Sequence, residues 1–136
     1  VDRVRQTELL RMQLRSAEQL GKPVVLHCVR AFEPLMRVLE EYRLRAVIFH
    51  GFIGSPEQAA HALKRGYYLS FGERSLRSPR TAEVLRTMPA DRLFLETDES
   101  ETPIAEIYRR AAGLRDTTPG ELGRVVRENY KRIFEQ

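Results

Sequence analysis

Short apolar runs alternate with longer segments of helical periodicity along almost the whole chain of 136 residues. The apolar runs predict buried strands, and segments whose apolar residues recur every three or four positions predict amphipathic helices. The predicted strands cover residues 24–27, 46–50, 67–71 and 93–96. The predicted helices cover residues 4–20, 34–42, 56–66, 79–88, 104–113 and 119–134. The order is therefore one helix, then four strand–helix units, and one more helix.

Local signals support several of these boundaries. Gly21 is a helix stop, and Ser55 with Gln58 three residues later forms a capping box at a helix start. Thr118 and Glu121 predict a second capping box. In the first helix we expect an apolar stripe made of Leu9, Leu10, Met12, Leu14 and Ala17.

Strands that alternate with helices predict an α/β fold with parallel strands joined by right-handed crossovers. Two architectures fit the order: an open doubly wound sheet, or part of a (β/α)₈ barrel, which normally needs about 250 residues. No glycine-rich phosphate loop follows any predicted strand, which disfavours a dinucleotide-binding or P-loop fold. Without a linker or low-complexity segment, residues 1–136 are expected to form a single domain.

The composition is that of a soluble globular protein, with 42% hydrophobic and 31% charged residues. No apolar run approaches the roughly 20 residues that cross a bilayer, and no segment resembles a signal peptide. A single cysteine, Cys28, excludes an intramolecular disulfide. We therefore expect a cytoplasmic protein with no membrane partner.

The chain is basic, with a net charge of +4 and an isoelectric point of about 9.6. Arginine, which outnumbers lysine, pairs well with phosphate through its forked donors. This excess is compatible with a nucleic acid or phosphate ester substrate, although solvated helix faces account for most of the charges.

Three candidate metal ligands occupy equivalent places in the predicted sheet. His27 ends the first strand, His50 ends the second, and Asp98 lies just beyond the fourth. The carboxyl ends of parallel strands meet on one face, where active sites of barrels are found. Imidazole and carboxylate together suit zinc, manganese and similar divalent ions. The third histidine, His61, falls inside a predicted helix and is expected at the surface.

An acidic cluster at residues 96–101 directly follows the fourth strand. Carboxylates there could hold a metal or act as a general base, and Asp98 is our choice for both roles. Glu96 is a candidate supporting group for the ligands. Arg30 is a candidate contact for a substrate phosphate; alternatively it caps the following helix or forms an ordinary salt bridge. Cys28 is interpreted as a buried thiol.

Together these motifs resemble the TatD family of metal-dependent hydrolases. The segments Val-Leu-His-Cys at 25–28 and His-Gly-Phe-Ile-Gly-Ser at 50–55 resemble the family's strand-end histidine segments. Residues 67–72 match a family strand, and Asp-Arg-Leu-Phe-Leu-Glu-Thr-Asp at 91–98 matches its Asp-Arg-Leu-Leu-Leu-Glu-Thr-Asp run. Residues 129–134 match its carboxyl-terminal Asn and Phe pattern. The resemblance covers nearly the whole chain.

The resemblance implies the carboxyl-terminal half of an amidohydrolase-like (β/α)₈ barrel with a two-metal site holding Mg²⁺, Mn²⁺ or Zn²⁺. His27 and His50 would ligate one ion, while Asp98 would ligate the other and serve as the general base. The implied reaction is attack of metal-activated water on a phosphodiester bond of DNA, as in a 3′–5′ exonuclease.

Several family features are absent from these residues. The His-x-His motif and the glutamate of the Gly-Glu-x-Gly-Leu-Asp motif are missing, so the chain carries three of six expected ligands and about half of a barrel. Gly51 stands where the family has cysteine, and residues 99–100 are Glu-Ser instead of Ser-Pro.

Two alternatives to a nuclease remain open. One is a metal-dependent amidohydrolase acting on a small-molecule amide or ester. The other is an inactive half domain that needs a complementary amino-terminal half or associates with itself, because an isolated half barrel exposes strand edges and apolar surface.

Overall fold

Four parallel strands form a single sheet in which the strands follow one another in chain order. The computed structural model describes residues 3–27, 32–97 and 100–135. The strands are β1 (Val24–His27), β2 (Val47–His50), β3 (Tyr68–Phe71) and β4 (Leu93–Leu95), and each pairs in parallel with the next. The predicted parallel α/β fold is confirmed. Among the described strands the order never reverses, as it would at the switch point of a doubly wound sheet, and this favours the barrel.

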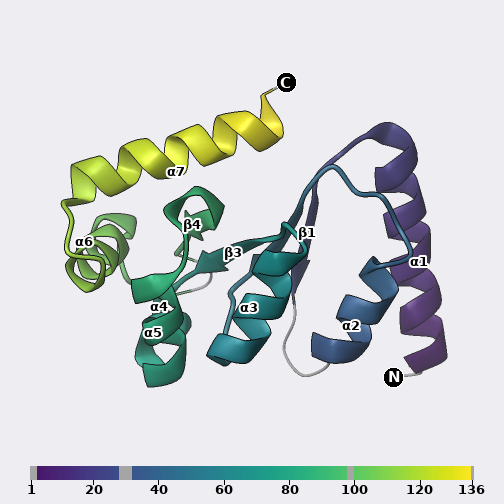
Figure 1. Cartoon of the computed structure of the whole chain (residues 1–136), viewed down its shortest axis with the longest axis horizontal. Coiled ribbons are helices and arrows are strands. Elements are labelled where there is room, and N and C mark those ends of the chain that lie inside the picture. The colour runs from purple at the N-terminus through teal and green to yellow at the C-terminus, as the bar shows by residue number, and fades with distance from the viewer. Residues whose placement is uncertain (1–2, 28–31, 98–99, 136) are drawn as a thin grey trace.

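Helices follow each strand and cover the two flanks of the sheet. They are α1 (Arg3–Leu20), α2 (Phe32–Leu39), α3 (Pro56–Lys64), α4 (Glu73–Arg77), α5 (Pro79–Thr87), the 3₁₀ turn η1 (Ala90–Arg92), α6 (Ile104–Leu114) and α7 (Pro119–Phe134). Figure 1 shows α1 and α2 at one flank of the sheet, with α6 and α7 at the other. Within the described residues, no helix combines the length and apolar character needed to span a membrane.

Most predicted boundaries lie within two residues of the observed ones, and the differences have local causes. The second helix begins at Phe32, with Pro34 in its first turn, and ends at Leu39 instead of residue 42. After Leu39 the chain continues in a tighter turn, in which Tyr42 N–H donates to Leu39 O at 3.1 Å. Sequence periodicity did not predict α4 and η1, which have five and three residues and are too short to show a helical period.

The predicted helix caps are present in whole or in part. At α3, the Ser55 hydroxyl accepts from Gln58 N–H at 3.2 Å, and Ser55 N–H donates to the Gln58 side chain at 2.9 Å. At α7, the Thr118 hydroxyl accepts from Glu121 N–H at 3.1 Å. The Glu121 carboxylate pairs instead with Arg124, so the second half of that predicted box is not formed.

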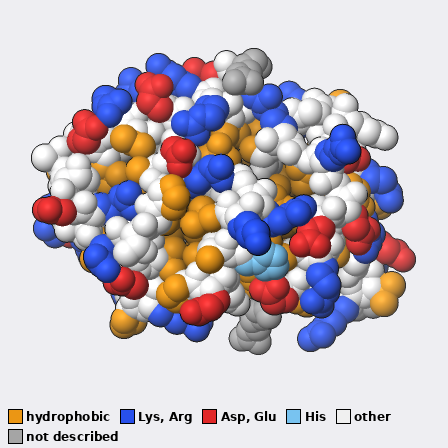
Figure 2. Space-filling view, viewed as in Figure 1, with side chains coloured by type: hydrophobic (Ala, Val, Ile, Leu, Met, Phe, Trp, Pro, Cys, Tyr) orange, Lys and Arg blue, Asp and Glu red, His pale blue; other side chains and the backbone are white. Residues whose placement is uncertain are grey.

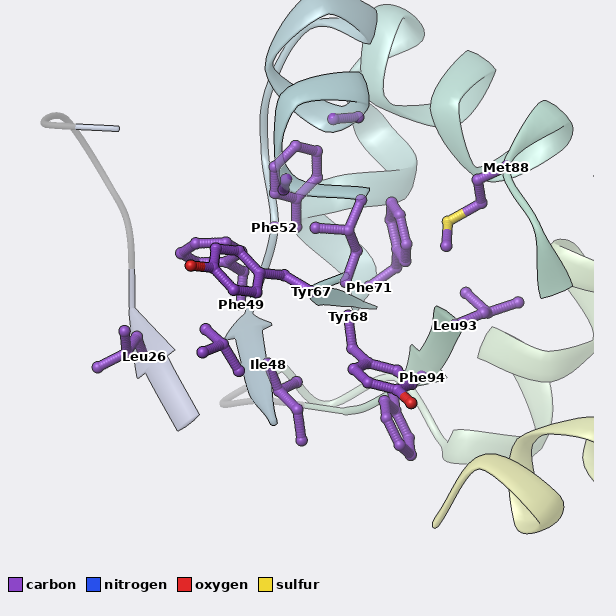
Figure 3. Packing of buried hydrophobic residues seen from close by; sticks show 14 of the residues in the cluster. Leu26, Ile48, Phe49, Phe52, Tyr67, Tyr68, Phe71, Met88, Leu93 and Phe94 are labelled. Carbon is purple, nitrogen blue, oxygen red and sulfur yellow. The ribbon is translucent and has the colours of Figure 1, made fainter. Parts of the chain in front are cut away.

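The two faces of the sheet have different environments. Phe49, Phe52 and Phe71 project to one side, while Ile48, Tyr68 and Phe94 project to the other (Figure 3). On the second side Tyr68 and Phe94 pack with ring centroids 5.7 Å apart. Alternation along each strand places the following residues on this same face: Val25, His27, Ile48, His50, Tyr68, Ser70, Phe94 and Glu96. This face therefore has an apolar layer and, toward the carboxyl ends of the strands, a polar layer.

The apolar stripe expected on the first helix is only partly correct. Leu14 and Ala17 are buried, and Leu10 packs against the core. These three residues are spaced by four and three positions and share one face of α1. Leu9 and Met12 lie off that face and are 56% and 58% exposed, so the stripe is narrower than predicted.

Asn129 joins α7 to the amino end of β4. Its buried side-chain amide donates to Ala90 O and Leu93 O, both at 2.9 Å. Its carbonyl oxygen accepts from the Arg132 guanidinium at 3.2 Å. The side chain thereby donates to one backbone carbonyl of the 3₁₀ turn and to one of β4.

Replacing Asn129 with alanine should destabilise the fold. Two backbone carbonyls would lose their donors, which costs about 2 kcal/mol or more in free energy of unfolding. Urea unfolding followed by circular dichroism measures the change, with exposed Glu128→Ala on the same helix as the control. A variant as stable as Glu128→Ala would show that Asn129 does not hold α7 to β4.

Candidate metal centre

His27 and His50 lie side by side at the carboxyl ends of neighbouring strands. The parallel register pairs them directly, so both project from the same face of the sheet. Their rings meet edge to face, with centroids 4.6 Å apart and an interplanar angle of 74°. Two imidazoles at this separation could donate nitrogen ligands to one small region at the end of the sheet.

Glu96, directly after β4, is anchored to two other strands through one carboxylate oxygen. Its Oε2 accepts from Gly51 N–H at 3.2 Å and from the Ser70 hydroxyl, and lies 2.9 Å from His50 Nδ1. The side chain is only 12% exposed. Its second oxygen, Oε1, is buried and has no hydrogen-bond partner among the described residues.

The contact between Glu96 and His50 sets the chemistry of the imidazole. A ring that donates from Nδ1 to a carboxylate carries its lone pair on Nε2, and this is the common arrangement for metal-ligating histidines. Two imidazoles, together with a carboxylate oxygen that lacks a donor, suit zinc or another divalent ion of similar preference. The chemistry of these residues therefore fits a metal ion. Within the described residues, no group of three or more His, Cys, Asp or Glu is placed so that it could hold one.

The structure brings together some of the predicted site residues and leaves others undescribed. His27 and His50 are adjacent, and Glu96 contacts His50 as a supporting group would. Asp98 and Arg30 lie outside the described residues, and so does Cys28. His61 lies on α3 instead, partly exposed, with its Nδ1 3.2 Å from Glu33.

Two further residues that contact Glu96 were not predicted from the sequence. Ser70 is a polar residue in an otherwise apolar strand, and that contrast was the signal available. Gly51 has a φ of 62°, a left-handed conformation that glycine adopts readily, and its N–H points at Glu96. A cysteine at position 51, as in the family pattern, would be strained in this conformation.

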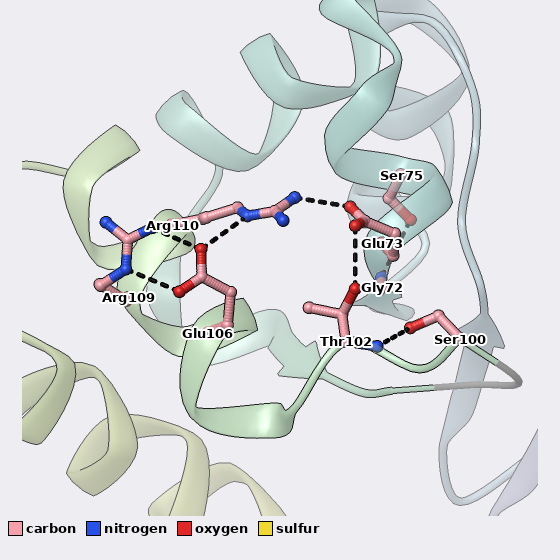
Figure 4. A network of polar contacts seen from close by, with 8 residues as sticks. All are labelled: Gly72, Glu73, Ser75, Ser100, Thr102, Glu106, Arg109 and Arg110. Atoms are coloured by element: carbon pink, nitrogen blue, oxygen red, sulfur yellow. Dashed lines mark hydrogen bonds and ion pairs between the residues drawn. The ribbon is translucent and has the colours of Figure 1, made fainter.

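A second polar network borders the same end of the sheet (Figure 4). Glu73, the first residue of α4, accepts from the Thr102 hydroxyl at 2.9 Å and pairs with Arg110 at 2.6 Å. Arg110 also donates to Glu106 at 3.1 Å, and Arg109 donates to the same carboxylate at 2.8 Å. The network links α4, α6 and the connection that precedes α6.

The arginines of this network favour the ionised carboxylates. Hydrogen bonds from Arg110 and then Thr102 hold the pKa of Glu73 below its usual value. Arg109 and then Arg110 lower the pKa of Glu106 to about 2. Both carboxylates are therefore negatively charged at neutral pH.

Comparisons with known proteins agree with the sequence resemblance. The model of the family described as TatD related DNase matches residues 1–135. The chain is 30% identical to the uncharacterized metal-dependent hydrolase YabD of Bacillus subtilis, over 95% of this chain and 57% of that protein. It is also 30% identical to a protein of Erwinia tasmaniensis named 3′–5′ ssDNA/RNA exonuclease TatD, over 90% of this chain and 56% of that protein.

The fold matches a solved relative over the same portion. The crystal structure of YjjV, a TatD homolog from Escherichia coli, superposes with a TM-score of 0.87 at 27% identity. The match covers 97% of this chain and 57% of that one. The chain thus spans about half the length of the relatives it matches, which confirms the expectation of half a (β/α)₈ barrel.

The low pKa of Glu106 predicts how acid affects stability. Its pKa is about 2 in the fold against an ordinary value of 4.5, so its stabilising contribution is present above pH 4.5 and is lost as the pH falls toward 2. In thermal unfolding scans between these pH values, Glu106→Gln should lose less stability with falling pH than the wild type. Glu8→Gln, which changes an exposed carboxylate on α1, should follow the wild-type curve. Parallel curves for Glu106→Gln and the wild type would contradict the prediction.

Proposed function

This chain belongs to the TatD related DNase family, and we propose that it forms the carboxyl-terminal catalytic half of a metal-dependent hydrolase that cleaves phosphodiester bonds in nucleic acid. The observation that carries the proposal is the pair of histidines at neighbouring strand ends, one of them in contact with a carboxylate that is only 12% exposed. This arrangement positions nitrogen ligands where barrel enzymes carry their active sites.

Each residue of the site has a proposed role. His27 and His50 hold one divalent ion (Mg²⁺, Mn²⁺ or Zn²⁺) through imidazole nitrogens. Glu96 keeps the His50 ring in its orientation and tautomer. Asp98 contributes a carboxylate to a second ion and accepts a proton from the attacking water. When bound, such ions acidify water and neutralise charge on phosphoryl oxygens.

Nucleic acid is the proposed substrate for two reasons. One relative is named as an exonuclease of single-stranded DNA and RNA, and others are named as deoxyribonucleases. The chain also carries a net positive charge of +4, which attracts a polyanion. Arg30, three residues after His27 in sequence, is the proposed contact for a substrate phosphate.

We further propose that residues 1–136 are completed by a complementary half that closes the barrel. Among the described strands, β1 and β4 each pair on one side only. Val25, on the face that a closed barrel buries, is 51% exposed. A groove of about 780 Å³ runs beside β4, lined in part by Phe94, Tyr108 and Tyr130. Figure 2 shows apolar side chains at the surface in the middle of one face of the molecule.

Nucleotide release from a 3′-labelled single-stranded oligonucleotide tests the proposed reaction. We expect cleavage that requires Mg²⁺, Mn²⁺ or Zn²⁺, stops with a chelator, and falls at least about a hundredfold in Asp98→Ala and His50→Ala. His61→Ala is the matched control, because it removes a histidine that lies on α3, outside the site. The assay is run on the chain alone and on the chain joined to an amino-terminal segment carrying the His-x-His and Gly-Glu-x-Gly-Leu-Asp motifs.

Comparing cleavage by the chain alone with cleavage by the extended form distinguishes the possible explanations. Cleavage by the extended form alone would identify the chain as a catalytic half. If neither form cleaves the oligonucleotide but either hydrolyses a small amide or ester, the substrate class proposed here is wrong and the amidohydrolase alternative holds.

The proposed completion of the barrel can be tested by measuring the molar mass of the chain in solution. Light scattering after gel filtration should show self-association of the chain alone and a defined 1:1 complex when the amino-terminal segment is added in trans. Tyr108→Lys in the groove beside β4 should weaken that complex, whereas Arg86→Ala on the exposed face of α5 should not. A stable monomer that does not bind the added amino-terminal segment would contradict the proposed completion of the barrel.

A further inference from the structure

Three exposed arginines follow β3 in quick succession and form a basic surface. Arg74 and Arg77 lie on α4, and Arg80 lies in the first turn of α5. Residues 72–82 contain one other charged residue, Glu73, so this short segment carries a net charge of +2, half of the +4 of the whole chain. Positive charge concentrated in this way attracts a polyanion.

The three side chains of this arginine surface (Arg74, Arg77 and Arg80) have no part in holding the fold together. Within the part of the chain that the structure describes, they donate to no carboxylate and to no backbone carbonyl. Arg115, by contrast, donates to Leu85 O at 2.7 Å near the end of α5. The guanidinium groups of the arginine surface therefore face solvent, where a ligand can reach them.

The fold places the arginine surface at the same edge of the sheet as the candidate metal centre. The helix α4 begins two residues after β3 ends at Phe71, whose carbonyl accepts from Glu96 N–H at 2.9 Å. The first turn of α5 is bound to the connection after β2, because the buried Thr81 hydroxyl contacts both Gly54 N and Gly54 O at 3.0 Å. Gly54 lies four residues after His50. Both arginine-bearing helices, which lie next to each other (Figure 1), thus start at the carboxyl ends of the strands.

The surroundings of the arginine surface leave its charge effective. Glu73, the acidic residue of the segment, is already paired with Arg110 of α6 at 2.6 Å and is 18% exposed. A groove of about 410 Å³ adjoins the surface and is lined by residues of α4, α5 and α6, among them Leu76, Ala82 and Arg110. The basic surface therefore borders a hollow whose far wall also carries arginine.

We propose that the arginine surface binds the phosphate backbone of a nucleic acid strand whose scissile bond lies at the candidate metal centre. The inference rests on the proposed function in taking nucleic acid as the substrate. Guanidinium groups pair with phosphate oxygens through their forked donors, and contacts to phosphates position a strand without reading its sequence. The surface would therefore favour longer strands over shorter ones, whatever their sequence.

Fluorescence anisotropy of a labelled oligothymidylate of about 20 nucleotides, with a chelator present to prevent cleavage, tests the inference. Combined replacement of Arg74, Arg77 and Arg80 with glutamine should weaken binding at least about tenfold at about 100 mM salt. The slope of log K against log salt should fall in magnitude by about 2, because each phosphate contact to a single strand contributes about 0.7. Replacement of the same three residues with lysine keeps the charges and should keep most of the slope.

A second triple variant is the matched control. Arg15, Arg43 and Arg65 are also exposed; Arg43 and Arg65 precede β2 and β3, at the opposite edge of the sheet, and Arg15 lies on α1. Their replacement with glutamine changes the net charge by the same amount and should leave binding as in the wild type. An equal loss of affinity in both triple variants would assign the attraction to net charge alone and overturn the inference.

Cleavage assays separate failure of this inference from failure of the proposed function. In the form extended at its amino terminus, the glutamine variant of the arginine surface should raise KM for the long oligonucleotide and leave cleavage of a dinucleotide, which has a single phosphodiester bond, unchanged. Binding that depends on the arginine surface without any cleavage would support this inference and contradict the proposed reaction. Cleavage by the wild type with no binding of the oligonucleotide, or with binding that the glutamine variant leaves unchanged, would overturn the inference alone.

Discussion

The parallel register between β1 and β2 is the constraint on which the candidate metal centre depends. It pairs His27 with His50 and places both on the face of the sheet opposite to Phe49. A slip of one residue in either strand would turn its histidine toward the helices and its apolar neighbours toward the site. Burial of Leu26 and Phe49 against the helices therefore also fixes the position of the two imidazoles.

The Glu96 carboxylate depends on this register and also reinforces it. One oxygen receives contacts from residues at the ends of β2 and β3, so a single side chain after β4 joins three strand ends. Buried polar oxygens in proteins ordinarily accept at least one hydrogen bond. Oε2 has such donors, whereas Oε1 has none among the described residues. The two oxygens of this carboxylate therefore have unequal environments, one with three polar contacts and one with none among the described residues.

Sequence periodicity predicted the fold well because each strand and long helix contains its own signal. It placed all four strands and found the cap at Ser55, since those features depend on neighbours in the chain. It also predicted that His27 and His50 lie together, because strand ends of parallel sheets share one edge. It could not find the bond between Glu73 and Thr102, which joins residues 29 positions apart. On α1 it overestimated the width of the buried apolar stripe, because Leu9 and Met12 are apolar but face away from the core.

The connections at the carboxyl ends of the strands require a different kind of support from the strands themselves. Residues within β3 and β4 are held by a backbone ladder, but the segment after Glu96 leaves that ladder. At the described ends of the connection between β4 and α6, side chains make the contacts instead: Glu96 at one end, and Glu73 through Thr102 at the other. Arg110 holds the pKa of Glu73 below its usual value, so the ionised acceptor for the Thr102 hydroxyl persists at neutral pH. The described ends of the connection between β4 and α6 are therefore held by side-chain carboxylates where the backbone ladder has ended.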